Sequence, residues 1–242
     1  MCEDQSNQSS SFYSFGETDL AAKRLRVVSE IFDATNEMFI SEAVRSHPHL
    51  ALDLGCGPGF TTRLLSRITR PEKIVGVDRS EAFLNRARVS NTAASEEFVA
   101  ADVAAVPMSI EGLPGRPDLI YARFLASHLP EPERAIVGWT RELEAGGLLL
   151  IEELEGVSTR VAVFKEYLEI VTEMLSSHGN ELLVGARLAT FPWDELGLGV
   201  EINRTVEVRP SSEQAASMFS MNLLTWRHDP YVATTYPREQ IE

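Results

Sequence analysis

Short apolar runs alternate with longer amphipathic stretches through the middle of the chain. The apolar runs predict five strands, at residues 49–55, 73–80, 96–103, 118–123 and 146–154. Apolar residues at helical spacing predict helices between them, at residues 59–68, 81–90 and 131–143. Strands that alternate with helices of this length are joined by right-handed crossovers. We therefore expect an α/β fold with a doubly wound, mostly parallel sheet.

The segments on either side of this core also carry periodic patterns. Thr18 is a candidate cap, and the apolar residues that follow it predict a long amphipathic helix to about Arg45. Residues 158–177 predict a helix with two apolar faces, which could roof a pocket, form a subunit contact or simply pack on its own domain. Residues 198–208 alternate and predict a sixth strand, whereas residues 212–226 predict a further helix.

The chain has no linker rich in glycine, proline or serine that would separate two independent domains. We expect a flexible tail and lid at residues 1–16 and a single domain at 17–242. Within that domain, a core at about 48–155 precedes a helical cap and substrate region at about 156–242. The last residues make a poor strand, apart from a few around 231–236, so one sheet edge is expected to be open. An open edge would favour a homodimer.

Composition narrows the functional classes. The 242 residues are 44% hydrophobic, which is enough for a substantial core, and the two cysteines, Cys2 and Cys56, indicate no disulfide framework. The formal charge of −14 disfavours nucleic acid as a partner, because lysine and arginine carry most of the affinity for phosphates. No stretch has the pattern of a signal peptide or a membrane span, so we expect a cytoplasmic protein with no membrane partner.

The segment ALDLGCGPGF, residues 51–60, joins the first predicted strand to a helix. Its glycines, Gly55, Gly57 and Gly59, allow a sharp turn and let a ligand approach the main chain. A dinucleotide site uses the spacing G-x-G-x-x-G, whereas this loop has G-x-G-x-G with Asp53 two residues before the first glycine. Asp53 would repel a diphosphate but would suit a ligand that carries an ammonium and a sulfonium, such as S-adenosylmethionine.

The next two predicted strands end in acids. Asp78 follows Gly55 by 23 residues, a spacing suited to a carboxylate that binds the hydroxyls of a ribose, and Asp102 ends the third strand. Parallel sheets bind ligands at the carboxyl ends of their strands. The glycine loop and both acids are therefore expected to border one crevice.

Five segments taken together resemble the class I S-adenosylmethionine-dependent methyltransferases: LDLGCGPGF, VGVDRS, AADV, DLIYARFLASHLPEP and LEAGGLLLIEEL. The resemblance covers about residues 48–155 and implies a Rossmann-like methyltransferase fold with an N-terminal helical lid and C-terminal helical insertions. It implies that the cofactor is S-adenosylmethionine, with S-adenosylhomocysteine as the product. The residues that it assigns to the methionine end of the site are Asp53, Gly55, Gly57 and Gly59.

The resemblance also implies roles for residues at the later strand ends. Asp78 would hold the ribose, Asp102 would meet the adenine amino group or merely cap the next turn, and the Val103 N–H would meet a ring nitrogen. Arg123 would contact the methionine carboxylate or else pair with a surface acid. His128 would serve as a general base or as a structural residue that pins its loop.

Aromatic and acidic residues elsewhere suggest further contacts. Tyr13 and Phe15 would close over the cofactor as part of a lid, or would form a hydrophobic staple at the helix start. One of Glu152, Glu153 and Glu155 could meet a substrate amine. The pattern offers no metal site, although His228 adjoins Asp229.

We expect the chain to transfer a methyl group to a small molecule, with secondary metabolites as one class of acceptor. Two alternatives remain open at this stage: a non-catalytic protein that binds S-adenosylmethionine, and, less favoured, an NAD-dependent oxidoreductase. The sequence does not decide whether the acceptor atom is oxygen, nitrogen or carbon.

Overall fold

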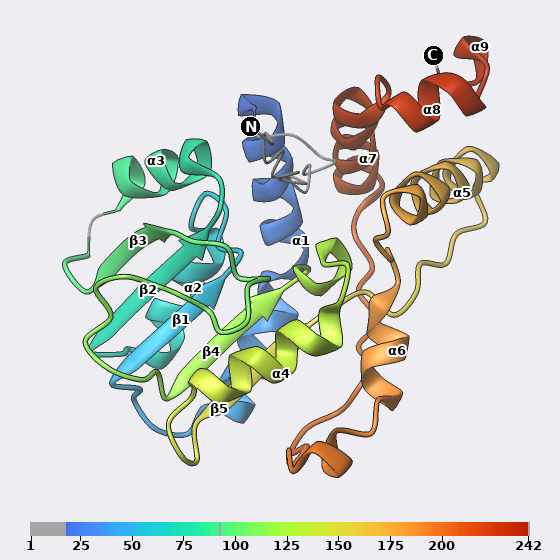
Figure 1. The fold of residues 1–242 in the computed structure, drawn as a ribbon. Helices are drawn as coiled ribbons and strands as arrows, with labels where there is room; N and C mark the ends of the chain where they lie inside the picture. Colours follow the sequence, from blue (N-terminus) through green and yellow to red (C-terminus); the bar gives the residue numbers. More distant parts are fainter. Residues whose placement is uncertain (1–17, 92, 242) are drawn as a thin grey trace, which may run out of the picture.

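A parallel sheet of five strands, in the order β3-β2-β1-β4-β5, lies at the centre of the molecule (Figure 1). The computed structural model describes residues 18–91 and 93–241. The strands are β1 (Leu50–Leu54), β2 (Lys73–Asp78), β3 (Glu96–Ala100), β4 (Leu119–Arg123) and β5 (Leu148–Glu152). The strand order reverses between β1 and β4, which confirms the predicted doubly wound sheet and places a crevice at their carboxyl ends.

Helices cover both faces of the sheet. On one face lie α1 (Asp19–Ala43) and α2 (Phe60–Thr69), which pack on a core that includes Ala51, Ile74, Leu119, Tyr121 and Leu150. The other face is covered by α4 (Pro132–Glu142) and α6 (Val184–Thr190), whose core includes Leu52, Val75, Ile120, Trp139 and Val184. Helix α3 (Glu81–Ser90) joins β2 to β3. Because β1 is buried on both faces, its sequence is a nearly continuous apolar run in which Asp53 is the exception.

Helix α1 begins where the sequence predicts. The Thr18 hydroxyl accepts a hydrogen bond from the Ala21 N–H at 3.3 Å, which caps the helix, and the helix ends at Ala43, two residues before the predicted end. Its apolar stripe is interrupted by Ser29 and Asn36, which are both buried. Buried polar side chains are costly unless they form hydrogen bonds, and the hydrogen bonds of these two residues belong to the site described below.

The C-terminal helices form a cap with a core of its own. Helices α5 (Ala162–Ser177), α7 (Ser212–Trp226), α8 (Pro230–Thr235) and α9 (Arg238–Ile241) lie beyond β5, to the right of the sheet in Figure 1. Their shared core contains Ile170, Val171, Met174, Leu175, Trp226 and Val232. Helix α7 also packs along α1, where Arg24 donates a hydrogen bond to the side-chain amide oxygen of Asn222 at 3.0 Å.

Two expectations about the C-terminal strands are wrong. Residues 198–208 form no strand, because side chains anchor the segment instead of a backbone ladder; Asn203, for example, donates to the Ala189 carbonyl at 2.8 Å. The residues around 231–236 form α8, which Asp229 caps by accepting from the Tyr231 N–H at 2.9 Å. In the described part of the chain, β5 is therefore the last strand on its side of the sheet.

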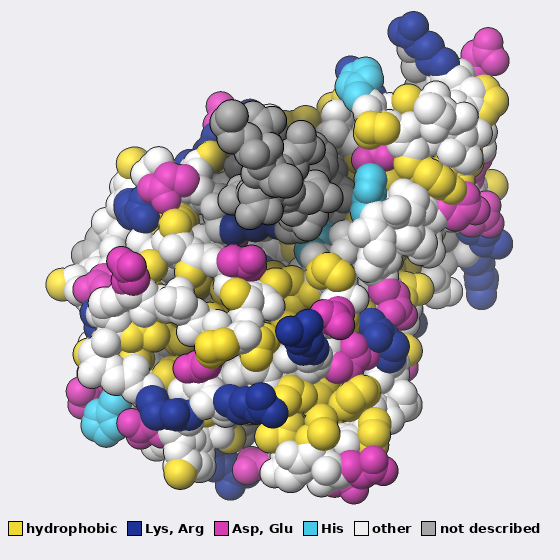
Figure 2. Space-filling model, in the orientation of Figure 1, with side chains coloured by type: hydrophobic (Ala, Val, Ile, Leu, Met, Phe, Trp, Pro, Cys, Tyr) yellow, Lys and Arg dark blue, Asp and Glu magenta, His cyan; other side chains and the backbone are white. Residues whose placement is uncertain are grey.

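Acidic and basic side chains are intermixed on the face shown in Figure 2, and neither sign forms a continuous patch there. None of the helices described is both long enough and apolar enough to cross a membrane.

Candidate functional site

A cavity of about 1960 Å³ opens at the carboxyl ends of the strands. Its floor is the glycine loop and the ends of β2, β4 and β5, and its walls are α1, the cap helices and residues 197–210. Seven of the predicted site residues within the described ranges line this cavity: Gly55, Gly57, Asp78, Asp102, Val103, Arg123 and His128. The sheet therefore brings the strand-end residues together, as the doubly wound topology predicts.

The loop after β1 exposes bare backbone to the cavity. Gly55, Gly57 and Gly59 have φ angles of +68°, +52° and +80°, in the left-handed region that side chains rarely adopt. A Cβ added to Gly55 would lie 2.9 Å from Leu125 Cδ1, so this position also lacks room for a side chain. Gly55 and Gly57 line the cavity and carry no side chain, so a ligand can approach their peptide groups closely.

Asp78 joins the first two strand ends. Its Oδ2 accepts a hydrogen bond from the Gly57 N–H at 2.8 Å, and its Oδ1 accepts one from the Ser80 N–H at 2.8 Å. Each carboxylate oxygen has a second lone pair, so both can also accept from ligand hydroxyls. Asp78 is half-buried at the cavity wall, where such hydroxyl contacts are partly shielded from water.

Asp53 lies behind the glycine loop. It is fully buried, and its Oδ2 accepts hydrogen bonds from the hydroxyls of Thr61 and Thr62, both at 2.6 Å. Burial raises the pKa of Asp53 to about 6, against the effect of the two hydroxyls, which lower it. Asp53 and Gly59 do not line the cavity, so their direct contact with a ligand stays a prediction; in this structure Asp53 anchors the start of α2.

Asp102 and Val103 lie just beyond the end of β3. The Asp102 Oδ1 accepts from the Ala104 N–H at 2.9 Å, which is the turn-capping role considered as the alternative for this residue. Its Oδ2 has capacity for a ligand. The Val103 carbonyl accepts from the Trp139 indole N–H at 2.7 Å, which fixes the peptide that borders the cavity. The adenine contacts of both residues stay predictions.

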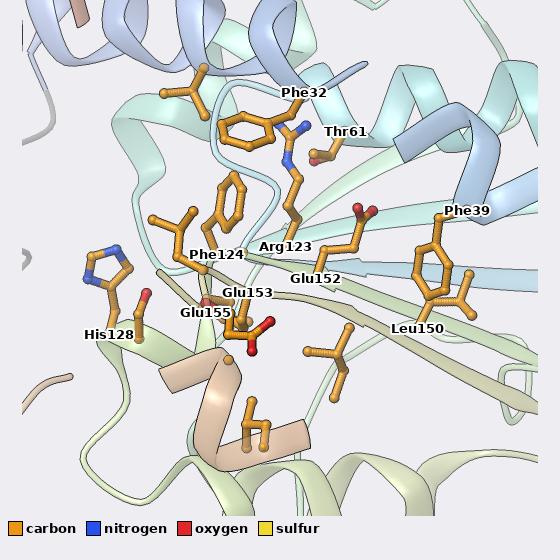
Figure 3. A pocket seen from close by; sticks show the side chains of 18 of the residues that line it. Phe32, Phe39, Thr61, Arg123, Phe124, His128, Leu150, Glu152, Glu153 and Glu155 are labelled. Carbon is orange, nitrogen blue, oxygen red and sulfur yellow. The ribbon is translucent and has the colours of Figure 1, made fainter. Parts of the chain in front are cut away.

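Arg123 is the centre of a polar network that sequence reasoning missed. Its guanidinium lies 3.8 Å from the Asp33 carboxylate of α1 and beside the Glu152 carboxylate of β5 (Figure 3). The Asn36 amide bridges these groups when its oxygen accepts from Arg123 and its nitrogen donates to Glu152 at 2.9 Å. The Tyr121 hydroxyl donates to the other oxygen of Glu152 at 2.7 Å.

A signal for this network was present in the sequence. Ser29, Asp33 and Asn36 recur at helical spacing on α1, and the Ser29 hydroxyl donates to Asp33 at 2.8 Å. A polar row of this kind on an amphipathic helix indicates that this face of the helix contacts polar groups on other elements. Arg123 was expected either to contact a methionine carboxylate or to pair with a surface acid. The pairing with Asp33 is of the second kind. The contact with a methionine carboxylate stays a prediction.

His128 has an environment that disfavours the charged imidazole. Burial and the nearby positive charges of Arg24 and Arg79 lower the pKa of His128 to about 3. A general base is most effective when its pKa is near the working pH. The base role of His128 stays a prediction, and this low pKa argues for the structural alternative.

Glu153 holds the turn that carries His128. Its Oε1 accepts from the Ala126 N–H at 2.6 Å, at the start of the short helix η1 (Ala126–His128). The same turn contacts the glycine loop through Leu125 and contacts α1 through Phe124, whose ring centroid lies 4.9 Å from that of Phe32. Burial raises the pKa of Glu153 to about 8 despite these backbone hydrogen bonds. Glu153 therefore connects the end of β5 to the loop after β4.

Other predictions fall outside this description. Tyr13 and Phe15 lie outside the described residues. Among the residues that are described, no group of three or more His, Cys, Asp or Glu side chains has an arrangement that could hold a metal ion. Asp229 binds His178 at 2.9 Å rather than its sequence neighbour His228.

The chemistry of this cavity fits S-adenosylmethionine. Gly55 and Gly57 present peptide groups to the cavity without side chains, Asp78 offers acceptors for hydroxyls, and Asp102 offers an acceptor for an amino group. Residues 52–151 match the methyltransferase domain family. This segment of the chain is therefore similar to the class I S-adenosylmethionine-dependent methyltransferases. The cofactor of this family is S-adenosylmethionine.

Curated relatives match over part of their length. The chain is 38% identical over 101 residues to a trans-aconitate 2-methyltransferase of Variovorax paradoxus, and the match covers 42% of this chain and 37% of the relative. A trans-aconitate 2-methyltransferase of Delftia acidovorans is 39% identical over 103 residues, with 36% of its length covered. The chain thus spans little more than a third of the curated relatives that it matches.

Solved structures agree on the fold. A methyltransferase structure from Bacillus halodurans, described as putative, superposes with a TM-score of 0.55 at 22% identity and covers 86% of this chain and 87% of its own. The [4+2]-cyclase SpnF superposes with a TM-score of 0.51 at 18% identity and covers 86% of this chain and 74% of its own. The fold alone therefore does not decide the reaction.

Proposed function

We propose that the chain transfers a methyl group from S-adenosylmethionine to a small organic acceptor, of the kind found among secondary metabolites. The observation that carries this proposal is the convergence of Gly55, Gly57 and Asp78 on one wall of a cavity that continues past the ends of β4 and β5. One end of the cavity offers the groups that an adenosyl cofactor needs. The rest leaves room for a second molecule beside it.

The chain's own residues contribute mainly alignment and exclusion of water. Bound S-adenosylmethionine supplies a methyl group that the sulfonium has already activated. Asp78 fixes the ribose, the glycine loop positions the methionine portion, and α1 covers the cavity with Phe32 and Phe39. Alignment of this kind can contribute roughly 7 to 11 kcal/mol to a reaction between two bound molecules.

Calorimetry tests the identity of the cofactor. The full chain is titrated with S-adenosylmethionine, with S-adenosylhomocysteine and with NAD. We expect binding of the first two and no heat with NAD. A screen of small molecules with S-[methyl-³H]-adenosylmethionine then tests transfer. Cofactor binding without transfer to any acceptor would favour the non-catalytic alternative.

We also propose that the chain forms a homodimer through the open edge of the sheet. Among the described strands, β5 pairs only with β4, so its outer edge has no strand partner there. Light scattering gives the molar mass in solution. A mass equal to the monomer at micromolar concentration would contradict the proposal.

A further inference from the structure

The acceptor side of the cavity can be placed from the fold. The ends of β1, β2 and β3 carry the residues suited to the adenosyl group, and Arg123 at the end of β4 is expected to meet the methionine carboxylate, so the end of β5 is left for the acceptor. This inference rests on the proposed function. Figure 3 shows Arg123 and Glu152 at the ends of β4 and β5, with the guanidinium beside Phe32 and Thr61 and the Glu152 carboxylate between Arg123 and Phe39.

The walls on this side are mostly apolar and aromatic. The rings of Phe164 and Tyr167 on α5 lie 5.1 Å and 4.8 Å from the ring of Phe219 on α7, and all three residues line the cavity. Trp193 and Leu150 add further apolar surface. Such walls suit a hydrophobic body, and a few polar groups then fix its orientation.

Three of the arginines that line the cavity engage acids of the chain, whereas Arg24, which also lines it, donates to the side chain of Asn222. Arg123 pairs with Asp33 at 3.8 Å, Arg204 with Glu42 at 2.7 Å and Arg209 with Glu207 at 2.9 Å. An anionic acceptor would have to compete with these carboxylates. The network of Asp33, Arg123 and Glu152 contains two acids and one cation, so it has a net charge of −1 when both acids are ionised.

Acceptor capacity remains at the end of β5. Glu152 receives hydrogen bonds from Tyr121 on one oxygen and from Asn36 on the other, and two ionised carboxylate oxygens can accept about four. The adjacent Glu153 lines the cavity too, but its Oε2 is buried and its pKa is raised to about 8, so it adds no ionised carboxylate for a ligand at neutral pH. The unused acceptors of Glu152 suit a hydrogen-bond donor rather than an anion.

We propose that the acceptor is a hydrophobic molecule with a basic amine that binds Glu152, and that polycarboxylates such as trans-aconitate are excluded. In the transfer, the ammonium form of the acceptor first loses a proton to the Glu152 carboxylate. The lone pair that is freed on nitrogen then forms the bond to the methyl carbon. The bond from that carbon to sulfur breaks, and its electron pair stays on sulfur to give S-adenosylhomocysteine. Burial raises the pKa of Glu152, which suits a group that takes up a proton.

Calorimetry on the full chain saturated with S-adenosylhomocysteine tests the proposal with three probes. The probes are 4-phenylbutylamine, 4-phenylbutanoate, which has the same body and the opposite charge, and trans-aconitate. We expect the amine to bind at least about 10-fold more tightly than either anion. Equal or tighter binding of an anion would overturn the proposal. If S-adenosylhomocysteine itself does not bind, the proposed function fails instead.

Variants then test Glu152 itself. We expect Glu152→Gln to weaken amine binding by about 10-fold and to change S-adenosylhomocysteine affinity by less than this. Glu97→Gln, on the exposed face of β3 where Glu97 pairs with Lys73, is the control and should change neither affinity. Amine affinity that is unchanged in Glu152→Gln would overturn the assignment. If circular dichroism shows that this variant does not fold, the ranking of the three probes on the unaltered chain decides.

Discussion

The carboxylate of Asp78 accepts a hydrogen bond from the Gly57 backbone N–H at 2.8 Å. The acid at the end of β2 therefore holds the turn that follows β1. We propose that the same carboxylate binds ligand hydroxyls, so that loop geometry and ligand recognition would depend on one side chain.

Replacement of Asp78 by asparagine should weaken S-adenosylhomocysteine binding. The asparagine amide keeps one acceptor oxygen, but its NH₂ group faces an N–H and a ligand hydroxyl that the second carboxylate oxygen would have accepted from. The loss of these hydrogen bonds should cost about 2 kcal/mol, or roughly 30-fold in affinity. Isothermal titration calorimetry measures the change. Asp118→Asn is a matched control, because Asp118 accepts from the His49 and Leu50 N–H groups at 2.9 and 3.0 Å at the opposite end of the sheet. Equal losses in both variants would contradict a ligand role for Asp78.

The glycine loop allows a second test of the cofactor site. Gly55→Ala would force a side chain into the left-handed region and against Leu125, with a strain of about 1–2 kcal/mol from the backbone alone. We expect S-adenosylhomocysteine affinity to fall by about 10-fold, and the added change Leu125→Ala to restore part of it.

Gly112 supplies the control for that test. It has a φ of +78° and no heavy atom within 4 Å of an added Cβ, so Gly112→Ala carries similar backbone strain without a contact in the cavity. We expect Gly112→Ala to reduce the free energy of unfolding but to keep the affinity. If Gly55→Ala and Gly112→Ala bind S-adenosylhomocysteine equally well, the loop does not form the site.

Stability should fall as pH rises, in part because of Glu153. Its pKa is raised from an ordinary value of 4.5 to about 8 in the folded chain, so the folded state holds more protons than the unfolded state between these values. The stabilising contribution of the protonated acid is present at low pH and is lost as pH rises through 8. Asp53, with a pKa of about 6, acts in the same direction at lower pH.

Urea unfolding between pH 6 and 8.5 measures this dependence. We expect the free energy of unfolding to decline with pH in the unaltered chain and to decline less steeply in Glu153→Gln, because the amide does not titrate. The range stays above the sequence pI of about 4.9, where the chain would associate. Parallel curves for the two proteins would show that Glu153 is ionised throughout.

Cys56 should resist thiol reagents in the folded chain. It is buried beside the glycine loop, and burial raises the pKa of its thiol well above the ordinary value, so little thiolate forms. A Cys2→Ser variant isolates this thiol for reaction with a chromogenic disulfide. We expect slow reaction in buffer and fast reaction in urea; fast reaction in buffer would mean that the loop opens readily.

The alternation of short apolar runs and helices was sufficient to predict the sheet. All five strands and the helices between them lie within a few residues of their predicted positions, because crossover connections demand that pattern. The prediction of a sixth strand was wrong because alternation with a period of two indicates only an extended chain with two different faces. Whether residues 198–208 join a sheet depends on a partner edge, which local pattern does not specify.

The residues that line the candidate site were predictable where backbone geometry dictates the residue. Gly55, Gly57 and Asp78 follow from the turn and from the strand ends, whereas the network of Asp33, Asn36 and Glu152 depends on how α1 crosses the sheet. That crossing is a tertiary contact. Only the polar interruption of the α1 stripe at Ser29, Asp33 and Asn36 hinted at it.

A crystal structure of the chain with S-adenosylhomocysteine tests most directly whether Asp78 and the glycine loop form the cofactor site. We expect both ribose hydroxyls within hydrogen-bonding distance of the Asp78 carboxylate and the amino-acid portion against the backbone of Gly55 and Gly57. A ligand bound elsewhere, with Asp78 hydrogen-bonded only to Gly57 and Ser80, would contradict the account.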